Sequence, residues 1–494
     1  MTKKHLLLFF FFCVCSVSTY ANFNFNANCV NAYEAIISLR INEARQLIQK
    51  EKQHDPKNGI IIMLENYVDF FSLMASDNKN DYERLKDYRS DRLSALEDNS
   101  DEKSPYYLYT QAEVYLQWGL LKGRFGDYLS SARDLKKASN LLKENTKKFP
   151  DFTPNKKGIA LVNVIFGSIP SNMKGITSFL GMTGNAPTGI KQLEALRLEL
   201  PKSKYELFKD EVIFFLCYIN IDVLHNKNSY DKLIGYVADM DSKSLLKSYL
   251  QGYVAFKSAH NEEAINFLKS APASTIYIDM PPIDYLLGNA KLNRLDTDAY
   301  VYLNNYLRSY KGINFIKDTY LKLAYFYLLK GDNAKYDYYL KQVRAKGYAV
   351  DEKDKQALKE ANDAPPDTDL LRARFYFDGG YYNKALAELK DEKVNTFKLL
   401  RDKIEFYYRL GRVYDRMEHD NEALQNYQQA INLGKKTSYY YAANAALSIG
   451  YIYERKKDYP RAASFYKQAI DMDDHEYKSS IDNEAKDGLK RLGK

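Results

Sequence analysis

Hydrophobic positions recur along most of the chain with the spacing of an amphipathic α-helix, while the alternation typical of a half-buried strand is hard to find. The clearest pattern covers residues 404–475. Gly411 is followed three positions later by Tyr414, and Gly450 is followed three positions later by Tyr453. Because small residues let helix backbones approach and large residues fill the gap that remains, this order predicts antiparallel helix pairs.

The second helix of each pair carries its own small and large residues. Ala423 and Ala462 lie twelve positions after the two glycines, Tyr427 and Tyr466 follow four positions later, and the whole unit recurs after 39 residues. The chain therefore predicts an all-α fold, an α-solenoid that winds as a right-handed superhelix of antiparallel helix pairs. Weaker copies of the template lie upstream at Ala373, Tyr376, Ala385 and Leu389, at Ala324, Tyr327, Tyr336, Leu340 and Val343, at Gly252, Ala264, Leu268 and Ala271, and at Gly288 with Tyr300.

The length of 494 residues exceeds what one compact core usually supports, so we expect several parts along the chain. Polar residues around Pro365-Pro366 interrupt the repeat and are typical of a loop or hinge. The expected parts are a signal peptide at 1–21, N-terminal helix pairs at 22–150, an apolar insert broken by Gly and Pro at 151–200, divergent pairs at 201–350, a polar linker at 351–369 and C-terminal pairs at 370–494.

The first residues have the pattern of a secretory signal. Lys3 and Lys4 form a basic start, an apolar stretch runs from Leu6 to Val17, and small residues precede a cut after Ala21. The apolar run is shorter than the roughly twenty residues of a membrane-spanning helix. This pattern predicts export to the periplasm or to the periplasmic face of the outer membrane.

Charge and cysteine content narrow the function classes. The formal net charge is +8, and Lys alternates with Asp and Glu along most segments, which is typical of solvated helix faces and disfavours a nucleic-acid partner. Removal of the signal would leave two cysteines, Cys29 and Cys217. Two thiols do not make a disulfide framework, and whether they pair stays open.

No constellation of catalytic chemistry stands out in the sequence. The histidines are scattered, and none has a second His or Cys at metal-ligand spacing. A nucleophile elbow, a phosphate-binding glycine loop and a dinucleotide fingerprint are also missing. We therefore expect no cofactor, no metal and no catalytic residue, although acid and base residues from distant repeats could still converge in an enzyme.

The periodic units resemble the tetratricopeptide-repeat (TPR) superfamily, most strongly over 404–475. The segment Gly158–Glu194, with Ile169-Pro170 and Phe179-Leu180-Gly181, is similar to a hallmark of the eukaryotic TPR family that includes the inclusion-body-clearance protein. The Tyr-, Asn- and Lys-rich composition with an export signal resembles Bacteroidetes envelope proteins. The insert is interpreted either as an internal core element or as a peripheral membrane contact through 158–182.

The TPR resemblance implies a role in binding a protein or peptide partner on the inner face of the array. That face is lined by fixed positions of the first helices, counted from Ala373, Gly411 and Gly450. A groove that mixes Arg with Tyr suits an extended peptide with acidic character. A glycan-binding SusD-like protein is the alternative from another class. The predicted groove residues are Arg374, Phe377, Tyr408, Arg412, Arg416, Tyr451 and Arg455.

Overall fold

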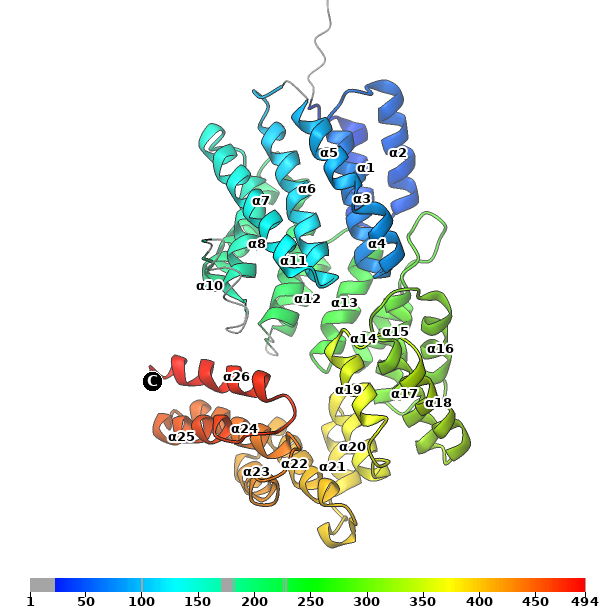
Figure 1. Ribbon diagram of the computed structural model, residues 1–494, viewed down its shortest axis with the longest axis vertical. Coiled ribbons are helices and arrows are strands. Elements are labelled where there is room, and N and C mark those ends of the chain that lie inside the picture. Colours follow the sequence, from blue (N-terminus) through cyan, green and yellow to red (C-terminus); the bar gives the residue numbers. More distant parts are fainter. Residues whose placement is uncertain are drawn as a thin grey trace, which may run out of the picture. The chain divides into compact units, whose positions relative to one another are not determined.

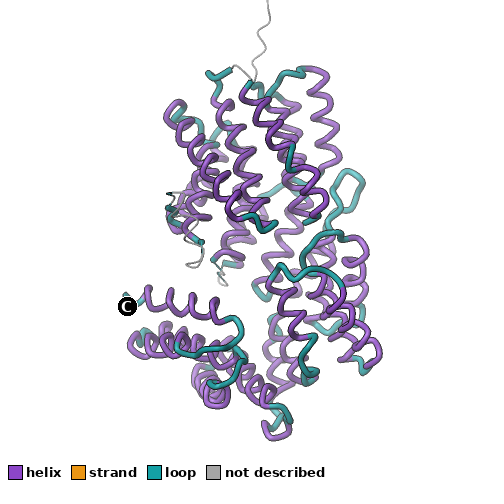
Figure 2. Tube along the Cα trace, in the orientation of Figure 1, coloured by secondary structure: helices purple, strands orange, loops and turns teal. Residues whose placement is uncertain are grey.

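The computed structural model describes residues 23–98, 101–169, 181, 183–224, 226 and 229–493. The predicted signal at 1–21 lies outside these residues. Within them the chain forms helices joined by turns and loops, with no strand (Figure 2). The predicted all-α fold of antiparallel helix pairs is confirmed.

The described chain divides into two compact units. Unit 1 takes the residues up to Ile36, then Asn42–Phe70 and Leu85–Phe208, and unit 2 takes Ile37–Ile41, Phe71–Arg84 and everything from Lys209 onward. The chain therefore passes between the two units more than once before residue 85.

Unit 1 is built around a long helix pair, α6 and α7. Asp127 begins α7 by accepting the N–H of Ser130, after Gly126 has turned the chain with a φ of 91°. A Cβ atom at Gly119 would come within 2.9 Å of the Leu135 side chain, so the two helices cross closely. The helices before residue 209, labelled in Figure 1, are α1 (Ala27–Ile37), α2 (Ile41–His54), α3 (Ile60–Ser76), α4 (Lys79–Leu85), α5 (Tyr88–Glu97), α6 (Pro105–Arg124), α7 (Tyr128–Lys148), α8 (Asn155–Gly167) and α10 (Ala186–Glu199). Of these, α4 up to Arg84 and the end of α3 from Phe71 belong to unit 2.

A buried ion pair joins three helices of unit 1. Lys157 on α8 is only 1% exposed, and its Nζ donates to Glu113 Oε2 on α6 at 2.9 Å and to the Tyr67 hydroxyl on α3 at 2.8 Å. The Tyr67 hydroxyl in turn donates to the same carboxylate at 2.6 Å. The Lys157 ammonium and the Tyr67 hydroxyl thus both bind Glu113 Oε2, which offsets the cost of burying this charge pair.

The apolar insert forms helices α8 and α10 where it is described. A Cβ atom at Gly189 would come within 2.5 Å of the Ala160 carbonyl oxygen, so α10 lies directly on α8. Leu161 and Val164 are buried. This packing agrees with the interpretation of an internal core element, while the part of the predicted membrane contact at 170–180 and 182 falls outside the described residues.

Unit 2 continues the helix pairs to the C-terminus, coloured green to red in Figure 1. Glycines face large side chains across each pair: Gly252 faces Leu268, and Gly411 faces Tyr427. Its helices from residue 209 onward are α11 (Lys209–Tyr218), α12 (Tyr230–Ala238), α13 (Leu245–Lys257), α14 (Asn261–Lys269), α15 (Pro281–Asn293), α16 (Ala299–Ser309), α17 (Ile316–Leu329), α18 (Asn333–Ala345), α19 (Glu352–Glu360), α20 (Thr368–Asp378), α21 (Tyr382–Leu389), α22 (Leu400–Arg416), α23 (Asp420–Gly434), α24 (Tyr441–Arg455), α25 (Tyr459–Ile470) and α26 (Lys478–Arg491).

The prediction of a polar linker at 351–369 is wrong for its first half. Helix α19 occupies Glu352–Glu360 and begins at Asp351, whose side chain accepts the N–H of Lys353. Ala357 and Ala361 are fully buried, because small residues let α19 lie close to its neighbours in the core. The stretch with Pro365-Pro366 does run as a loop.

Two short N-terminal segments complete unit 2. The Leu245 N–H donates to the Ser38 carbonyl oxygen at 3.1 Å, and the Ile278 N–H donates to the Leu39 carbonyl oxygen at 3.0 Å. Asp77, which lies between α3 and α4, accepts the hydroxyl of the buried Tyr310 at 2.9 Å. Unit 2 thus depends on residues that precede most of unit 1 in the sequence.

The two cysteines are both buried, and no disulfide joins Cys29 to Cys217 in the described chain. Burial raises the pKa of Cys29 to about 12, and the nearby Glu51 carboxylate adds to this. The Cys29 thiol is therefore protonated at neutral pH. Among the described helices, none combines the length and the apolar content that a bilayer span requires.

Candidate functional site

The first helices of successive pairs in unit 2 line a hollow of about 390 Å³. It gathers residues of α13, α15, α17, α19 and α20 together with Tyr477, which precedes α26. Its lining mixes both signs of charge with amides and a few apolar groups. The residues are Phe256, Lys257, Asn289, Asn293, Asp318, Leu321, Lys322, Glu352, Lys353, Gln356, Ala357, Glu360, Arg374, Asp378 and Tyr477.

Arg374, the first predicted groove residue, lines this hollow but is held by a carboxylate of the chain itself. Its Nη1 donates to Glu360 Oε2 at 3.0 Å, Gln356 donates to Glu360 Oε1 at 2.8 Å, and the Tyr325 hydroxyl also donates to Glu360. Burial alone would raise the pKa of Glu360, but the Arg374 charge and these hydrogen bonds outweigh it and hold the pKa at about 2. Arg374 therefore links α20 to α19 through this ion pair.

Three lysines of the hollow, Lys257, Lys322 and Lys353, lie near one another and share the lining with four carboxylates. Lys353 Nζ donates to the Tyr285 hydroxyl at 3.2 Å, and that hydroxyl donates to Asp318 Oδ2 at 2.7 Å. Desolvation lowers the pKa of Lys353, Asp318 opposes this shift, and the charges of Lys257 and Lys322 lower the pKa further. An anionic group next to Lys353 would reduce this repulsion.

Arg412 on α22 is a partly exposed cation of the predicted set that stacks on aromatic rings. Its guanidinium carbon lies 4.0 Å from the centre of the Phe377 ring and 5.7 Å from that of Tyr408. Among the described residues, no carboxylate lies within ion-pair distance of Arg412. Stacking on the ring orients the planar guanidinium and leaves its N–H donors to solvent or to a ligand.

The other predicted groove residues are engaged within the protein. Arg416 Nε donates to the Tyr382 hydroxyl at 3.1 Å. Arg455 Nη2 donates to Asp415 at 2.8 Å and to Asp420 at 2.9 Å.

Two of the predicted tyrosines also have partners inside the protein. The Tyr451 hydroxyl donates to Glu484 Oε2 on α26 at 3.0 Å. Tyr408 is only 3% exposed and packs against Tyr427, Tyr440 and Tyr441. It belongs to the core, because its ring fills the gap between α22 and α24, and it gives a ligand little surface.

Two asparagines that line the hollow are not among the predicted groove residues, although the spacing of the repeat points to their positions. Arg374 and Arg412 lie one position after the small crossing residues Ala373 and Gly411. The same count from Gly288 gives Asn289, and five positions after Gly288 gives Asn293, which also lines the hollow. Lys353 could not be found in this way, because α19 falls outside the repeat.

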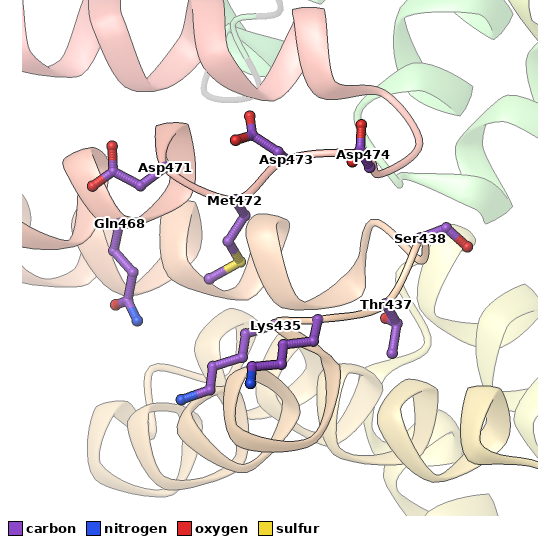
Figure 3. Close-up of a pocket in the computed structure, with 9 residues that line it drawn as sticks. Lys435, Thr437, Ser438, Gln468, Asp471, Met472, Asp473 and Asp474 are labelled. Carbon is purple, nitrogen blue, oxygen red and sulfur yellow. The ribbon is translucent and has the colours of Figure 1, made fainter.

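A second hollow of about 590 Å³ lies between the α23–α24 and α25–α26 turns. Figure 3 shows the carboxylates of Asp471 and Asp473 on one side and the ammonium of Lys435 on the other, with Met472 between them. Because the charged groups point apart, they do not converge on one ligand. In the described part of the chain, no group of three or more His, Cys, Asp and Glu side chains could hold a metal ion.

Comparisons with known proteins identify the repeat. A family model described as tetratricopeptide repeat matches residues 404–436, and a second model with the same description matches residues 445–476. These are the two units in which the glycine and tyrosine spacing is strictest. A search of curated protein sequences finds no match.

Several solved structures are similar at low identity. A chain of the APC/C hetero-tetramer Cut9-Hcn1 is 13% identical, with a TM-score of 0.26, over 94% of this chain and 95% of that one. A Rap protein complexed with competence and sporulation factor is 13% identical, with a TM-score of 0.31, over 83% and 97%. The human IFIT1 dimer with PPP-AAAA is 10% identical, with a TM-score of 0.33, over 90% and 94%.

Proposed function

The chain is a tetratricopeptide-repeat protein, and on that premise we propose that it is a non-catalytic scaffold that holds an extended, acidic segment of a partner protein in unit 2. Repeats of this kind generally mediate protein–protein interaction. The proposed surface runs from the lysine-lined hollow at α17 and α19 to Arg412 on α22.

The observation that carries the proposal is the state of Arg412. Its guanidinium is stacked on Phe377 and has no carboxylate partner among the described residues. Arg374 and Arg455, by contrast, are paired with carboxylates of the chain itself. An arginine that is pre-oriented on a ring pays little conformational entropy to bind, so Arg412 is well placed to take a carboxylate of a partner in bidentate geometry.

The lysines of the hollow extend this preference for acidic groups. Lys322 lies with its ammonium 5.5 Å from the centre of the Phe375 ring, and Lys353 donates only to a tyrosine hydroxyl among the contacts described. A peptide that carries two or more acidic side chains could engage Arg412 and these lysines together. The amides of Asn289 and Asn293 can bond a peptide backbone without selecting its sequence.

The proposed place of action is the cell envelope. It rests on the basic start and the apolar run within residues 1–21, which predict export. The scaffold would then assemble or position other exported proteins.

A peptide array tests the groove. Extended peptides of about ten residues and graded net charge would be presented to the purified protein, and the tightest acidic peptide would be measured by fluorescence anisotropy. Arg412→Ala is expected to weaken its binding at least about tenfold, because a ring-stacked guanidinium with no carboxylate partner among the described residues is lost.

The matched control is Arg461→Ala. Arg461 is also stacked on an aromatic ring, 4.5 Å from the Tyr453 ring centre, but it pairs with Asp458 and lies on α25, a second helix of its pair. This variant should bind as the unchanged protein does. Equal losses from both variants, or an array on which acidic peptides bind no better than neutral ones, would contradict the proposal.

A further inference from the structure

Helix α7 carries a mainly basic face on unit 1 that the groove does not explain. Its cations are Arg133, Lys136, Lys137, Lys143, Lys147 and Lys148, and Glu144 is its one exposed carboxylate in the described structure. The whole chain has a formal net charge of only +8. The other acidic residue of the helix, Asp134, is buried and neutralised by Arg89 and by Lys122 at 2.7 Å.

The cations share one side of the helix. At 100° per residue, the six fall within an arc of about 140°. The opposite side, which includes Leu135, Ala138 and Leu142, is buried against α6 and α8. The basic face therefore points outward along a helix that is about 31 Å long.

The stability of the helix does not account for this arrangement. Arg133 lies four positions before Lys137, and Lys143 lies four positions before Lys147, and like charges at this spacing destabilise a helix. Only the final two lysines suit the negative C-terminal end of the helix dipole. Glu144 lies on the same face and pairs with Lys148 at 2.8 Å, but the remaining excess of cations is not explained by helix stability.

We propose that the outer face of α7 docks on an anionic phospholipid surface. The face lies along a single helix, so it can meet a flat anionic surface along its length, whereas a bound peptide would need a groove with side-chain pockets. Leu129 is 40% exposed and lies on the same side as Arg133 and Lys136, in the first turn of the helix. It provides an apolar contact at one end of the basic row.

Vesicle flotation of the purified protein tests this docking. The protein should float with vesicles of phosphatidylcholine that contain about 30 mol% phosphatidylglycerol and should stay behind with phosphatidylcholine alone. About 0.5 M NaCl should release it, because exposed charges are then screened. Failure to float with the anionic vesicles would overturn the proposal, even if an acidic protein bound the same face.

The test variant combines Arg133→Glu, Lys137→Glu, Lys143→Glu and Lys147→Glu, and is expected to lose more than about a hundredfold in vesicle partitioning. The matched control reverses four exposed lysines of unit 2, at Lys390, Lys393, Lys398 and Lys435, and changes the net charge equally. It should still float. Equal loss from both variants would show dependence on net charge alone and would refute a docking face on α7.

Two further measurements keep the result interpretable. Circular dichroism and a thermal melt establish that each variant is folded, and a set with glutamine at the same four positions of α7 replaces the glutamate set if the latter unfolds. Because α7 belongs to unit 1, the variant should keep its affinity for the acidic peptide of the unit 2 groove. If no acidic peptide bound the groove, the vesicle assay would still test the α7 face. If the protein did not float with vesicles, the peptide assay would still test the groove.

Discussion

The ring of Tyr466 lies between two glycines, Gly450 on α24 and Gly488 on α26. A Cβ atom at Gly450 would come within 2.5 Å of the ring carbon Cδ1, and one at Gly488 would come within 2.6 Å of Cε2. Tyr466 is fully buried. The ring cannot move away from either neighbour, so both positions need a residue without a side chain.

Gly450→Ala is expected to lower the free energy of unfolding by about 1–3 kcal/mol, because the new methyl group overpacks a closed site. Gly235→Ala is the matched control: Gly235 is exposed on α12, and a Cβ atom there would meet nothing within 4 Å. That change should raise stability by about 0.5–1 kcal/mol through helix propensity. Urea unfolding followed by circular dichroism measures both, and shifts of the same sign would contradict this view of the packing.

Contacts between small and large residues were predictable because they are local in the sequence. Gly411 meets a ring sixteen positions later, at Tyr427, and the spacing fixes that partner. Charged side chains offered no such rule. Arg455 was predicted to face a ligand, yet it pairs with Asp415 and Asp420 on two other helices. A long flexible side chain can reach several carboxylates, and only the folded structure determines which of them lie near it.

At the scale of elements, α19 stabilises the start of α17. The carboxylate of Asp354 accepts the N–H of Phe315 at 2.6 Å and the N–H of Asp318 at 3.0 Å, so one helix caps another. Burial raises the pKa of Asp354 to about 7; these two donors oppose the shift, and the charges of Asp318 and Asp351 add to it.

The pKa shift predicts how stability depends on pH. In the unfolded chain Asp354 has a pKa near 3.8, so the folded state binds the proton more tightly. This contribution is fully present below pH 3.8 and is lost as the pH rises through about 7. Asp354→Asn, which mimics the protonated carboxyl group, should therefore be more stable than the unchanged protein at pH 8 and should approach its stability as the pH falls to about 3.8. Urea unfolding at a series of pH values measures the difference, and a constant difference would exclude this role.

The sequence did not reveal α19 because its pattern is too short and too polar. Nine residues with only two buried positions give little helical periodicity, and an aspartate such as the buried Asp354 is expected at the surface. The neighbouring elements decide its structure, since the N–H groups at the start of α17 need an acceptor. The groove residue Lys353 was missed for the same reason.

At the scale of the whole molecule, unit 2 includes Ile37–Ile41 and Phe71–Arg84. No periodicity predicts this, because hydrogen bonds between turns distant in the sequence leave no repeating signal. The buried Asp77 accepts both the Tyr310 hydroxyl and, at 3.2 Å, the Asn314 side-chain amide. A fragment that begins at Lys209 would leave these donors without their acceptor.

Asp77→Ala in the full chain is expected to destabilise unit 2 by about 1–3 kcal/mol, since buried donors lose their acceptor. Hydrogen exchange should show faster exchange in α16 and α17, with little change in α6 and α7 of unit 1. Asp81→Ala is the control, because Asp81 is exposed on α4 and pairs only with Arg84 at 2.8 Å among the contacts described. Unchanged exchange in α16 and α17 would show that Asp77 does not hold unit 2 together.

The bond from Tyr310 to Asp77 spans 233 residues of chain. A ribosome that adds about 5–20 residues per second makes the second partner about 10–50 s after the first. During that interval Phe71–Arg84 has emerged while the residues it will bond have not yet been made. The N-terminal helices can pair as they emerge, but unit 2 must wait until its last partners are synthesised, so its assembly is timed by translation rather than by local helix formation.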